Sequence, residues 1–271
     1  MRYFKNMVKP YIIWSFLMIV VPLLLIVLYS LTTGGNSLVN IQFTINNFTK
    51  IAEPIYLSVF MRSFKIGVWT VVICFLMGYP LAYMISKFSE KAQNILILVV
   101  TIPMWINMLL RTYAWISLLS DNGIINSFLV SLGFDPVEMM YTDFAVAIGL
   151  VCDFLPFMVI PIHTSLSKID HSLIEAAYDL GADRIQTFFN VVFKLSLPGV
   201  INGVIMTFLL SISSFVIPKL LGGGQYMLIG NLIENQFISV GDWNFGSAIS
   251  LLLAVVILFL IRLMKKIDPD D

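Results

Sequence analysis

The sequence predicts an all-α, polytopic membrane protein with six transmembrane helices. The chain of 271 residues is 59% hydrophobic and only 12% charged, and its mean hydropathy is +0.92. These values exceed those of a soluble domain of this size. The second observation is a series of long apolar runs, each close to the roughly 20 residues that cross a bilayer core of about 30 Å. The third is that these runs lack the alternating pattern of membrane β-strands.

Six apolar runs are expected to form the spans. The fourth run is interrupted by a single carboxylate, that of Asp153. The predicted spans cover approximately residues 11–31, 66–86, 92–119, 144–167, 195–218 and 243–262. Residues 1–271 are therefore expected to form one transmembrane domain.

The distribution of Lys and Arg predicts the orientation of the spans. Six spans place both termini on one side, and eleven of the sixteen Lys and Arg residues fall on that side. The other five are Lys50, Arg62, Lys65, Arg111 and Lys219. Because cytoplasmic loops carry the excess of basic residues, both termini are expected in the cytoplasm, with the spans in the cell (plasma or inner) membrane. The formal net charge is zero, which gives no support for binding to nucleic acid.

The longest predicted cytoplasmic connection, residues 168–194, contains a charged stretch that is unusual in so apolar a chain. Ser172 and Glu175 have the spacing of a capping box, which predicts a helix start there. Gly181 follows this helix at a position where a left-handed residue ends a helix at little cost. The small apolar residues that recur at helical spacing on one face are Leu173, Ala176, Ala177 and Leu180.

A second amphipathic run begins after Asp183 and leads into the fifth span. Its apolar residues, predicted to share one face, are Ile185, Phe188, Phe189 and Val192. The polar side of the preceding stretch is acidic, with Glu175, Asp179 and Asp183, and anionic lipid headgroups would repel it. We therefore favour a helix that enters a groove in a protein partner, where Ala permits close approach, over a helix packed on headgroups.

The letters "EAAYDLGAD" of residues 175–183 resemble the EAA motif of ATP-binding-cassette (ABC) importer permeases, Glu-Ala-Ala-x-x-x-Gly. In that family the motif lies in the cytoplasmic loop before the penultimate span, as it does here. The family pattern ends in Ile-x-Leu-Pro, whereas this chain has Lys194 at the position of the proline and Pro198 four residues later. Three longer strings resemble the spermidine/putrescine (PotB-like) branch of these permeases: "RTYAWISLLSDNGIIN", "LPFMVIPIHTSL" and "LLGGGQYMLIGNLIENQF".

The resemblance implies a type I ABC importer permease fold, with residues 168–194 as the cytoplasmic EAA coupling loop. It also implies which residues couple to an ATPase: Glu175, Ala176, Ala177, Leu180 and Gly181. The implied partners are a dimer of ABC ATPase subunits, a second homologous permease subunit and an extracytoplasmic solute-binding protein, all assembled at the lipid bilayer. The implied solute is a polyamine, spermidine or putrescine, and other small solutes remain an alternative.

A path for a cationic solute is expected to contain carboxylates and aromatic rings, because ring faces attract ammonium groups. The residues that we expect along it are Asp153, Trp105, Tyr113, Trp115, Glu234 and Asp242. Asp153 lies near the middle of the bilayer, where a carboxylate costs about 2.5–3.5 kcal/mol on insertion scales. Either Asp153 pairs structurally with Arg111, or it lines the path.

An intramembrane enzyme is the alternative from another class. The only two histidines, His163 and His171, form no His-Glu-x-x-His motif, and no Gly-x-Ser-x-Gly sequence occurs. No Walker A pattern occurs either, so ATP hydrolysis is expected on a separate subunit. Cys74 and Cys152 lie inside predicted spans without a ligand pattern around them, and no metal or cofactor is expected.

An ion-coupled carrier is a further alternative. It would show paired inverted halves, which the sequence does not indicate.

Overall fold

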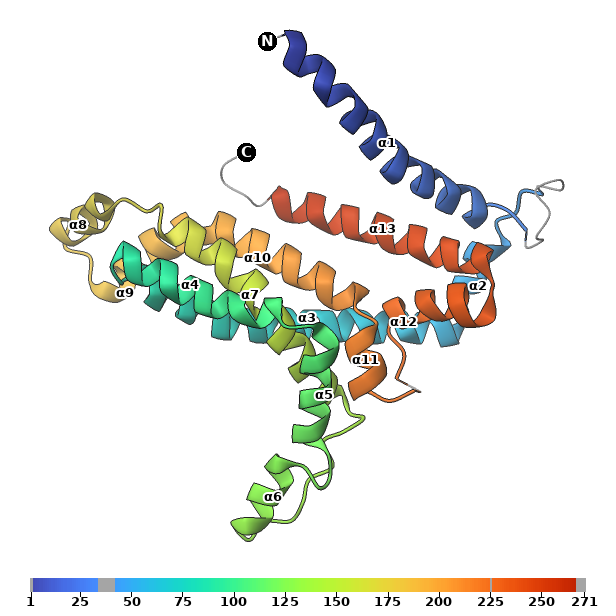
Figure 1. Cartoon of the computed structure of the whole chain (residues 1–271). Helices are drawn as coiled ribbons and strands as arrows, with labels where there is room; N and C mark the ends of the chain where they lie inside the picture. The colour runs from blue at the N-terminus through green and yellow to red at the C-terminus, as the bar shows by residue number, and fades with distance from the viewer. Residues whose placement is uncertain (1, 34–41, 225, 267–271) are drawn as a thin grey trace. The chain divides into compact units, whose positions relative to one another are not determined.

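The computed structural model describes residues 2–33, 42–224 and 226–266 (Figure 1). Part of the loop expected after the first span, residues 34–41, therefore lies outside the described residues. The elements in chain order are α1 (Arg2–Ser30), α2 (Asn46–Ile51), α3 (Pro54–Ser86), α4 (Glu90–Trp105), α5 (Met108–Leu119), α6 (Ile124–Ser131), α7 (Asp143–Leu166), α8 (His171–Asp179), α9 (Arg184–Thr187), the π-helix η1 (Phe188–Val192), α10 (Phe193–Ser213), α11 (Val216–Leu221), α12 (Ile229–Glu234), the π-helix η2 (Asn235–Val240) and α13 (Trp243–Lys265).

Long apolar helices dominate the described part of the chain. Five of its helical segments are long and apolar enough to cross a membrane, and the number is six if one bent pair of helices counts as a single span. These segments are Pro10–Ser30, Pro54–Ser86, Asp143–Leu166, Arg184–Ser213 and Trp243–Leu263, with the bent pair lying between the second and the third. The chain is thus a multi-pass membrane protein.

The run predicted as one span over residues 92–119 is broken. The helical segments Glu90–Trp105 and Met108–Ser131 meet at an angle of 86°. Pro103 lies in the last turn of α4 and has no N–H to continue the helical ladder, and Ile106 is extended. Asn107 then caps the new helix by accepting a hydrogen bond from the backbone N–H of Leu109 at 2.8 Å.

By its contacts the chain divides into two compact units, which are described separately. The larger unit comprises Phe60–Asn231 and Phe259–Asp271. At its centre α7 and α10 lie side by side (Figure 1). Gly199 on α10 permits this close approach, because a Cβ there would lie only 2.5 Å from the carbonyl oxygen of Pro161 on α7. One core cluster surrounds the first half of α7 and a second surrounds its other half.

The smaller unit comprises Met1–Val59 and Leu232–Leu258. In it the end of α1 is held by two amide side chains from elsewhere in the sequence. Asn47 of α2 donates to the carbonyl oxygens of Ser30 and Thr32 at 3.0 and 2.9 Å, and Asn244 of α13 donates to those of Tyr29 and Thr32. These bonds tie the end of α1 to α2 and α13, and the bond to Ser30 satisfies a carbonyl in the last turn of the helix.

Candidate functional sites

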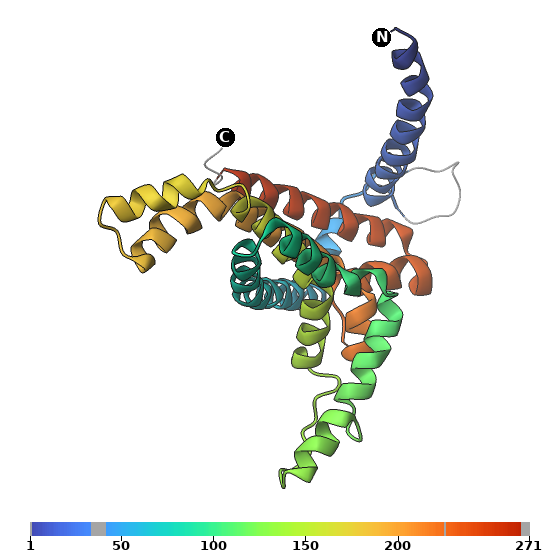
Figure 2. The ribbon, with the colours of Figure 1, turned by 60° about the vertical axis from the view of Figure 1, so that its left-hand side comes forward.

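The charged loop contains the two short helices that the sequence predicts, α8 and α9, and both views show them leaving the α7–α10 pair as a hairpin (Figures 1 and 2). The predicted start of α8 is wrong. The N-cap is Asp170, whose side chain accepts a hydrogen bond from the backbone N–H of Ser172 at 2.9 Å, so Ser172 and Glu175 form no capping box there. That bond holds the pKa of the Asp170 carboxyl below its usual value, because it stabilises the charged form.

The end of α8 is a Schellman turn at the predicted glycine. Gly181 has a φ of +84°, its N–H donates to the carbonyl of Tyr178, and the N–H of Ala182 donates to that of Ala177. A Cβ built on Gly181 would have nothing within 4 Å, so a larger residue there meets a backbone penalty and no clash. Gly181 therefore fixes the direction of the turn by local conformation alone.

The helix α8 has no residue buried against the rest of the unit. Glu175 and Ala176 are exposed, Ala177 is half-buried, and Leu180 is 89% exposed. The apolar residues of the predicted face are thus available for contact with another molecule. A helix this short is not stable from its own hydrogen bonds, so its caps at both ends matter for its form.

The second run departs from the predicted single apolar face. α9 begins with a capping box between Asp183 and Gln186, and the chain then continues as the π-helix η1. The wider π turn changes the side-chain spacing, so Val192 is buried and Phe188 half-buried, whereas Ile185 and Phe189 are 69% and 58% exposed.

Aromatic contacts join η1 to α3. The ring of Phe188 packs edge-on against Tyr79 and Tyr83 of α3, with centroids 5.9 and 5.3 Å away. The hydroxyl groups of Tyr79 and Ser196 of α10 share a buried hydrogen bond of 2.9 Å. This cluster was not predicted, although tyrosine and serine in charge-free spans were a signal for it, because buried hydroxyl groups need partners.

Asp153 of α7 lies beside Arg111 of α5. Their charged atoms are 3.2 Å apart, and the side chains are only 4% and 18% exposed. This contact is the structural alternative that the sequence analysis named, and the pairing is confirmed. Asp153 Oδ2 and Arg111 Nε have no hydrogen-bond partner among the described residues, so the pair is incompletely satisfied there.

The remaining residues predicted along the path are divided between the two units. Trp105 is 85% exposed at the end of α4, Tyr113 is 55% exposed on α5, and Trp115 packs partly against the core. These three belong to the larger unit with Asp153. Glu234, which is half-buried, and Asp242 belong to the smaller unit.

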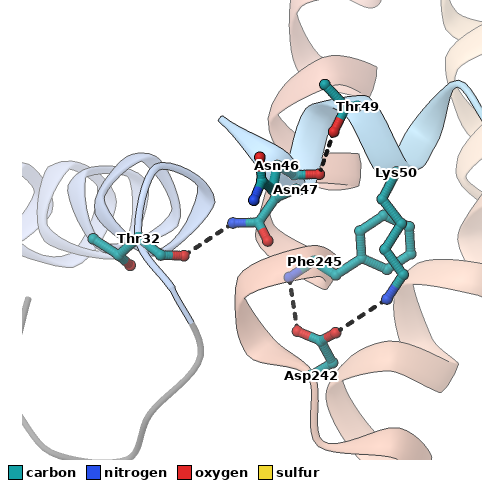
Figure 3. Close-up of polar contacts among 7 residues, drawn as sticks. All are labelled: Thr32, Asn46, Asn47, Thr49, Lys50, Asp242 and Phe245. Atoms are coloured by element: carbon teal, nitrogen blue, oxygen red, sulfur yellow. Dashed lines mark hydrogen bonds and ion pairs between the residues drawn. The ribbon is translucent and has the colours of Figure 1, made fainter. Parts of the chain in front are cut away.

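Asp242 has two neighbours that the sequence analysis did not identify (Figure 3). Its Oδ1 accepts a hydrogen bond from the backbone N–H of Phe245 at 3.0 Å, which places Asp242 as a cap before α13. Its Oδ2 lies 3.5 Å from Nζ of Lys50 on α2. The same ammonium group lies 4.3 Å from the centroid of the Phe245 ring.

A cleft of about 870 Å³ in the larger unit was also not predicted. It is lined by residues of α4, α7 and α10 and by Lys168 and Asp170 just before α8. Its walls are mostly apolar, and Thr164, Ser165 and Asn202 contribute polar groups. The sequence offered one signal for this cleft, the polar residue Asn202 within an otherwise apolar run.

This helical membrane fold, with an unpacked hairpin between its two central helices, is that of a type I ABC importer permease. A chain of a bacterial alginate ABC transporter, solved in complex with an alginate pentasaccharide-bound periplasmic protein, superposes with a TM-score of 0.78 over 99% of this chain and 94% of that one, at 16% identity. At this identity the likeness shows the fold alone.

Residues 76–270 match the model of the family described as "Binding-protein-dependent transport system inner membrane component". The chain belongs to this family. It is 38% identical over 246 residues, 90% of both chains, to "Spermidine/putrescine transport system permease protein PotB" of Escherichia coli (strain K12). It is also 38% identical over 251 residues to the protein of that name from Haemophilus influenzae, covering 92% of this chain and 88% of the other. The chain is therefore a transport subunit, and the alternative of an intramembrane enzyme is set aside.

Proposed function

We propose that this chain is the permease half of an ATP-driven importer for polyamines, spermidine or putrescine. The observation that supports the solute is the 38% identity, over 90% of both chains, to a permease named for spermidine and putrescine transport. Another small solute is the second candidate, because a relative at 27% identity over 85% of this chain is named only "Inner membrane ABC transporter permease protein YdcU".

The hairpin of α8 and α9 is the proposed docking element for the ATPase. Its support is structural: α8 has intact caps but no buried residue, and Leu180 is almost fully exposed. Glu175, Ala176, Ala177 and Leu180 would enter a groove of the ATPase, and Gly181 would set the turn that follows. The partners proposed are an ATPase dimer, a second homologous permease and an extracytoplasmic solute-binding protein, with both termini of this chain in the cytoplasm.

The contacts around η1 provide a route by which docking would move the spans. A displacement of α8 would reach α10 through α9 and η1, because α9, η1 and α10 form one continuous helical segment. It also reaches α3, because Phe188 packs on Tyr79 and Tyr83, and Tyr79 is hydrogen-bonded to Ser196. Closure of the ATPase dimer would then switch the path between inward and outward access by rigid-body movement of packed helices.

The cleft beside α8 is proposed to form the cytoplasmic end of the solute path. Thr164, Ser165 and Asn202 offer hydrogen-bonding groups there, and Asp170 adds a carboxylate. A polyamine carries both N–H donors and an alkyl chain, and the mixed apolar and polar lining suits both parts. The cytoplasmic end of the path would then lie next to α8, the helix proposed to couple transport to ATP hydrolysis.

Uptake in cells that lack their native polyamine importers tests the solute. Cells that express the complete importer should accumulate labelled putrescine or spermidine. Uptake of neither compound, with all subunits assembled in the membrane, would contradict the polyamine proposal.

Co-purification tests the docking. A tagged chain should retain the ATPase subunit, and Ala177→Trp should reduce its recovery because the indole crowds the narrow face of α8. Asp121→Asn, at an exposed position on the connector before α6, is the matched control and should leave recovery unchanged. Normal recovery and uptake with Ala177→Trp would contradict α8 as the docking helix.

A further inference from the structure

The ammonium group of Lys50 occupies a site formed by a carboxylate and an aromatic ring. Nζ lies 3.5 Å from Asp242 Oδ2 and 4.3 Å from the centroid of the Phe245 ring (Figure 3). A second ring, that of Tyr56, packs edge-on against Phe245 with a centroid distance of 4.8 Å. A negative charge and the face of a ring are the two groups that attract an ammonium ion.

The position of this site is fixed independently of Lys50. Asp242 Oδ1 accepts the backbone N–H of Phe245, so the carboxylate is held against the start of α13 while Oδ2 points to the ammonium. Phe245 is fully buried, and its ring therefore has a defined orientation. Lys50 is brought to the site by α2, which Asn47 ties to the end of α1.

The ion pair of Lys50 and Asp242 is open to exchange. The two side chains are 41% and 34% exposed. Ion pairs at this exposure are weak, since water solvates both partners and salt screens them. A free ammonium ion can therefore compete with Lys50 for the same carboxylate.

We propose that Asp242 and Phe245 form a binding site for a primary alkylammonium group, which Lys50 occupies when no solute is present. The chemistry of Lys50 identifies the class of ligand, because its side chain is itself an alkyl chain that ends in a primary ammonium. A linear diamine reproduces both parts. The proposed solute-binding site thus lies next to the start of α13, and the Lys50 side chain competes with the solute for it. This inference rests on the proposed polyamine function for its biological ligand.

The test is equilibrium binding of labelled putrescine to the purified complete importer in lipid nanodiscs. Lys50→Gln removes the competitor, and apparent affinity should rise by about tenfold, as expected if the site is open for about a tenth of the time in the wild type. Lys50→Gln combined with Asp242→Asn should lose this gain. Asn keeps the oxygen that caps α13, so the double variant removes the charge without removing the cap.

Lys65→Gln, which removes an exposed lysine on α3, is the matched control and should bind as the wild type does. The gain with Lys50→Gln should also shrink when the salt concentration is raised. Affinity within twofold of the wild type in Lys50→Gln, or a gain that persists in the double variant, would overturn the site. A lower melting temperature in Lys50→Gln without tighter binding would show a purely structural ion pair and would overturn it as well.

Uptake measured on the same importer separates this inference from the proposed function. Uptake of polyamines by the wild type with no effect of Lys50→Gln on binding overturns the site and leaves the function standing. In the opposite case, the wild type takes up no polyamine, but Lys50→Gln binds putrescine more tightly and Asp242→Asn abolishes this gain. That result supports an alkylammonium site and contradicts a polyamine as the transported solute.

Discussion

The consecutive helices α7 and α8 are stabilised in opposite ways. Twelve of the 24 residues of α7 are buried, including Asp153, whereas α8 has no buried residue. α7 depends on contacts with other helices, and α8 depends on Asp170 at one end and Gly181 at the other. A helix that is well formed but unpacked has its apolar face free for another molecule. Substitutions in α7 should therefore act on the stability of the fold, and those in α8 on coupling.

Arg111→Gln is expected to have the largest effect on stability. It leaves the carboxylate of Asp153, which is 4% exposed, without its partner, and breaking a buried pair in this way costs about 3–5 kcal/mol. The melting temperature of the purified importer in detergent should fall sharply. Arg111→Gln combined with Asp153→Asn should recover much of the loss, because no buried charge remains.

The same variants distinguish the two explanations of Asp153. A structural pair requires Asp153→Asn to lower assembly and the double variant to restore it. Normal assembly of Asp153→Asn with lost uptake of cations, whatever residue occupies position 111, would instead place Asp153 on the path. Full uptake and full stability of the single variant would contradict both explanations.

Gly199→Ala is expected to have the next largest effect. The added methyl group would lie 2.5 Å from the carbonyl oxygen of Pro161, and backbone on both helices would have to move apart. Overpacking of this kind costs about 1–3 kcal/mol. A lower melting temperature should be measured for Gly199→Ala but not for the control Gly224→Ala, where a Cβ has nothing within 4 Å. Equal melting temperatures would show that α7 and α10 are less tightly packed than their contacts indicate.

Gly181→Val should leave the melting temperature unchanged and impair uptake. A β-branched residue tolerates the φ of +84° poorly, so the turn after α8 should change direction while the core is untouched. Uptake and ATP hydrolysis by the assembled importer are the measurements. Gly181→Asn is the matched control, because Asn accepts a left-handed conformation, and it should retain more uptake than Val. Equal uptake by both variants would argue against a role for this turn.

Asp170→Ala should have the smallest effect on stability, measured as faster hydrogen exchange at the start of α8, with Ser172→Ala as the control. The pKa of Asp170 is lower in the folded chain than in the unfolded chain. The cap therefore stabilises the helix fully at pH values above the unfolded-chain pKa, and this stabilisation is lost as the pH falls through the folded-chain pKa. Exchange protection of α8, corrected for the intrinsic rate, should therefore be constant from about pH 5 to about pH 8. A larger change with Ser172→Ala than with Asp170→Ala would contradict the observed cap.

The membrane class, the position of most long helices and the glycine turn after α8 follow from local features of the sequence. Apolar runs of bilayer length leave little choice, because backbone groups in lipid must be satisfied within a helix. The end of α8 at Gly181 was predictable for a local reason, since the required φ favours glycine. The resemblance of residues 175–183 to a known motif also pointed to the family to which the chain belongs.

Other features depend on residues far apart in the sequence and became visible only in the folded chain. The contact of Arg111 with Asp153 depends on the packing of α5 against α7, which no local pattern in the sequence specifies. The 86° break after α4 is an exception: it was missed because both halves are apolar, although Pro103 and the capping residue Asn107 were local signals. The contact of Lys50 with Asp242 joins residues almost 200 positions apart and depends on α2, a short helix that no long periodic pattern indicates. Such contacts are set by the folded arrangement of helices, since local sequence carries no information about which distant side chain will lie opposite.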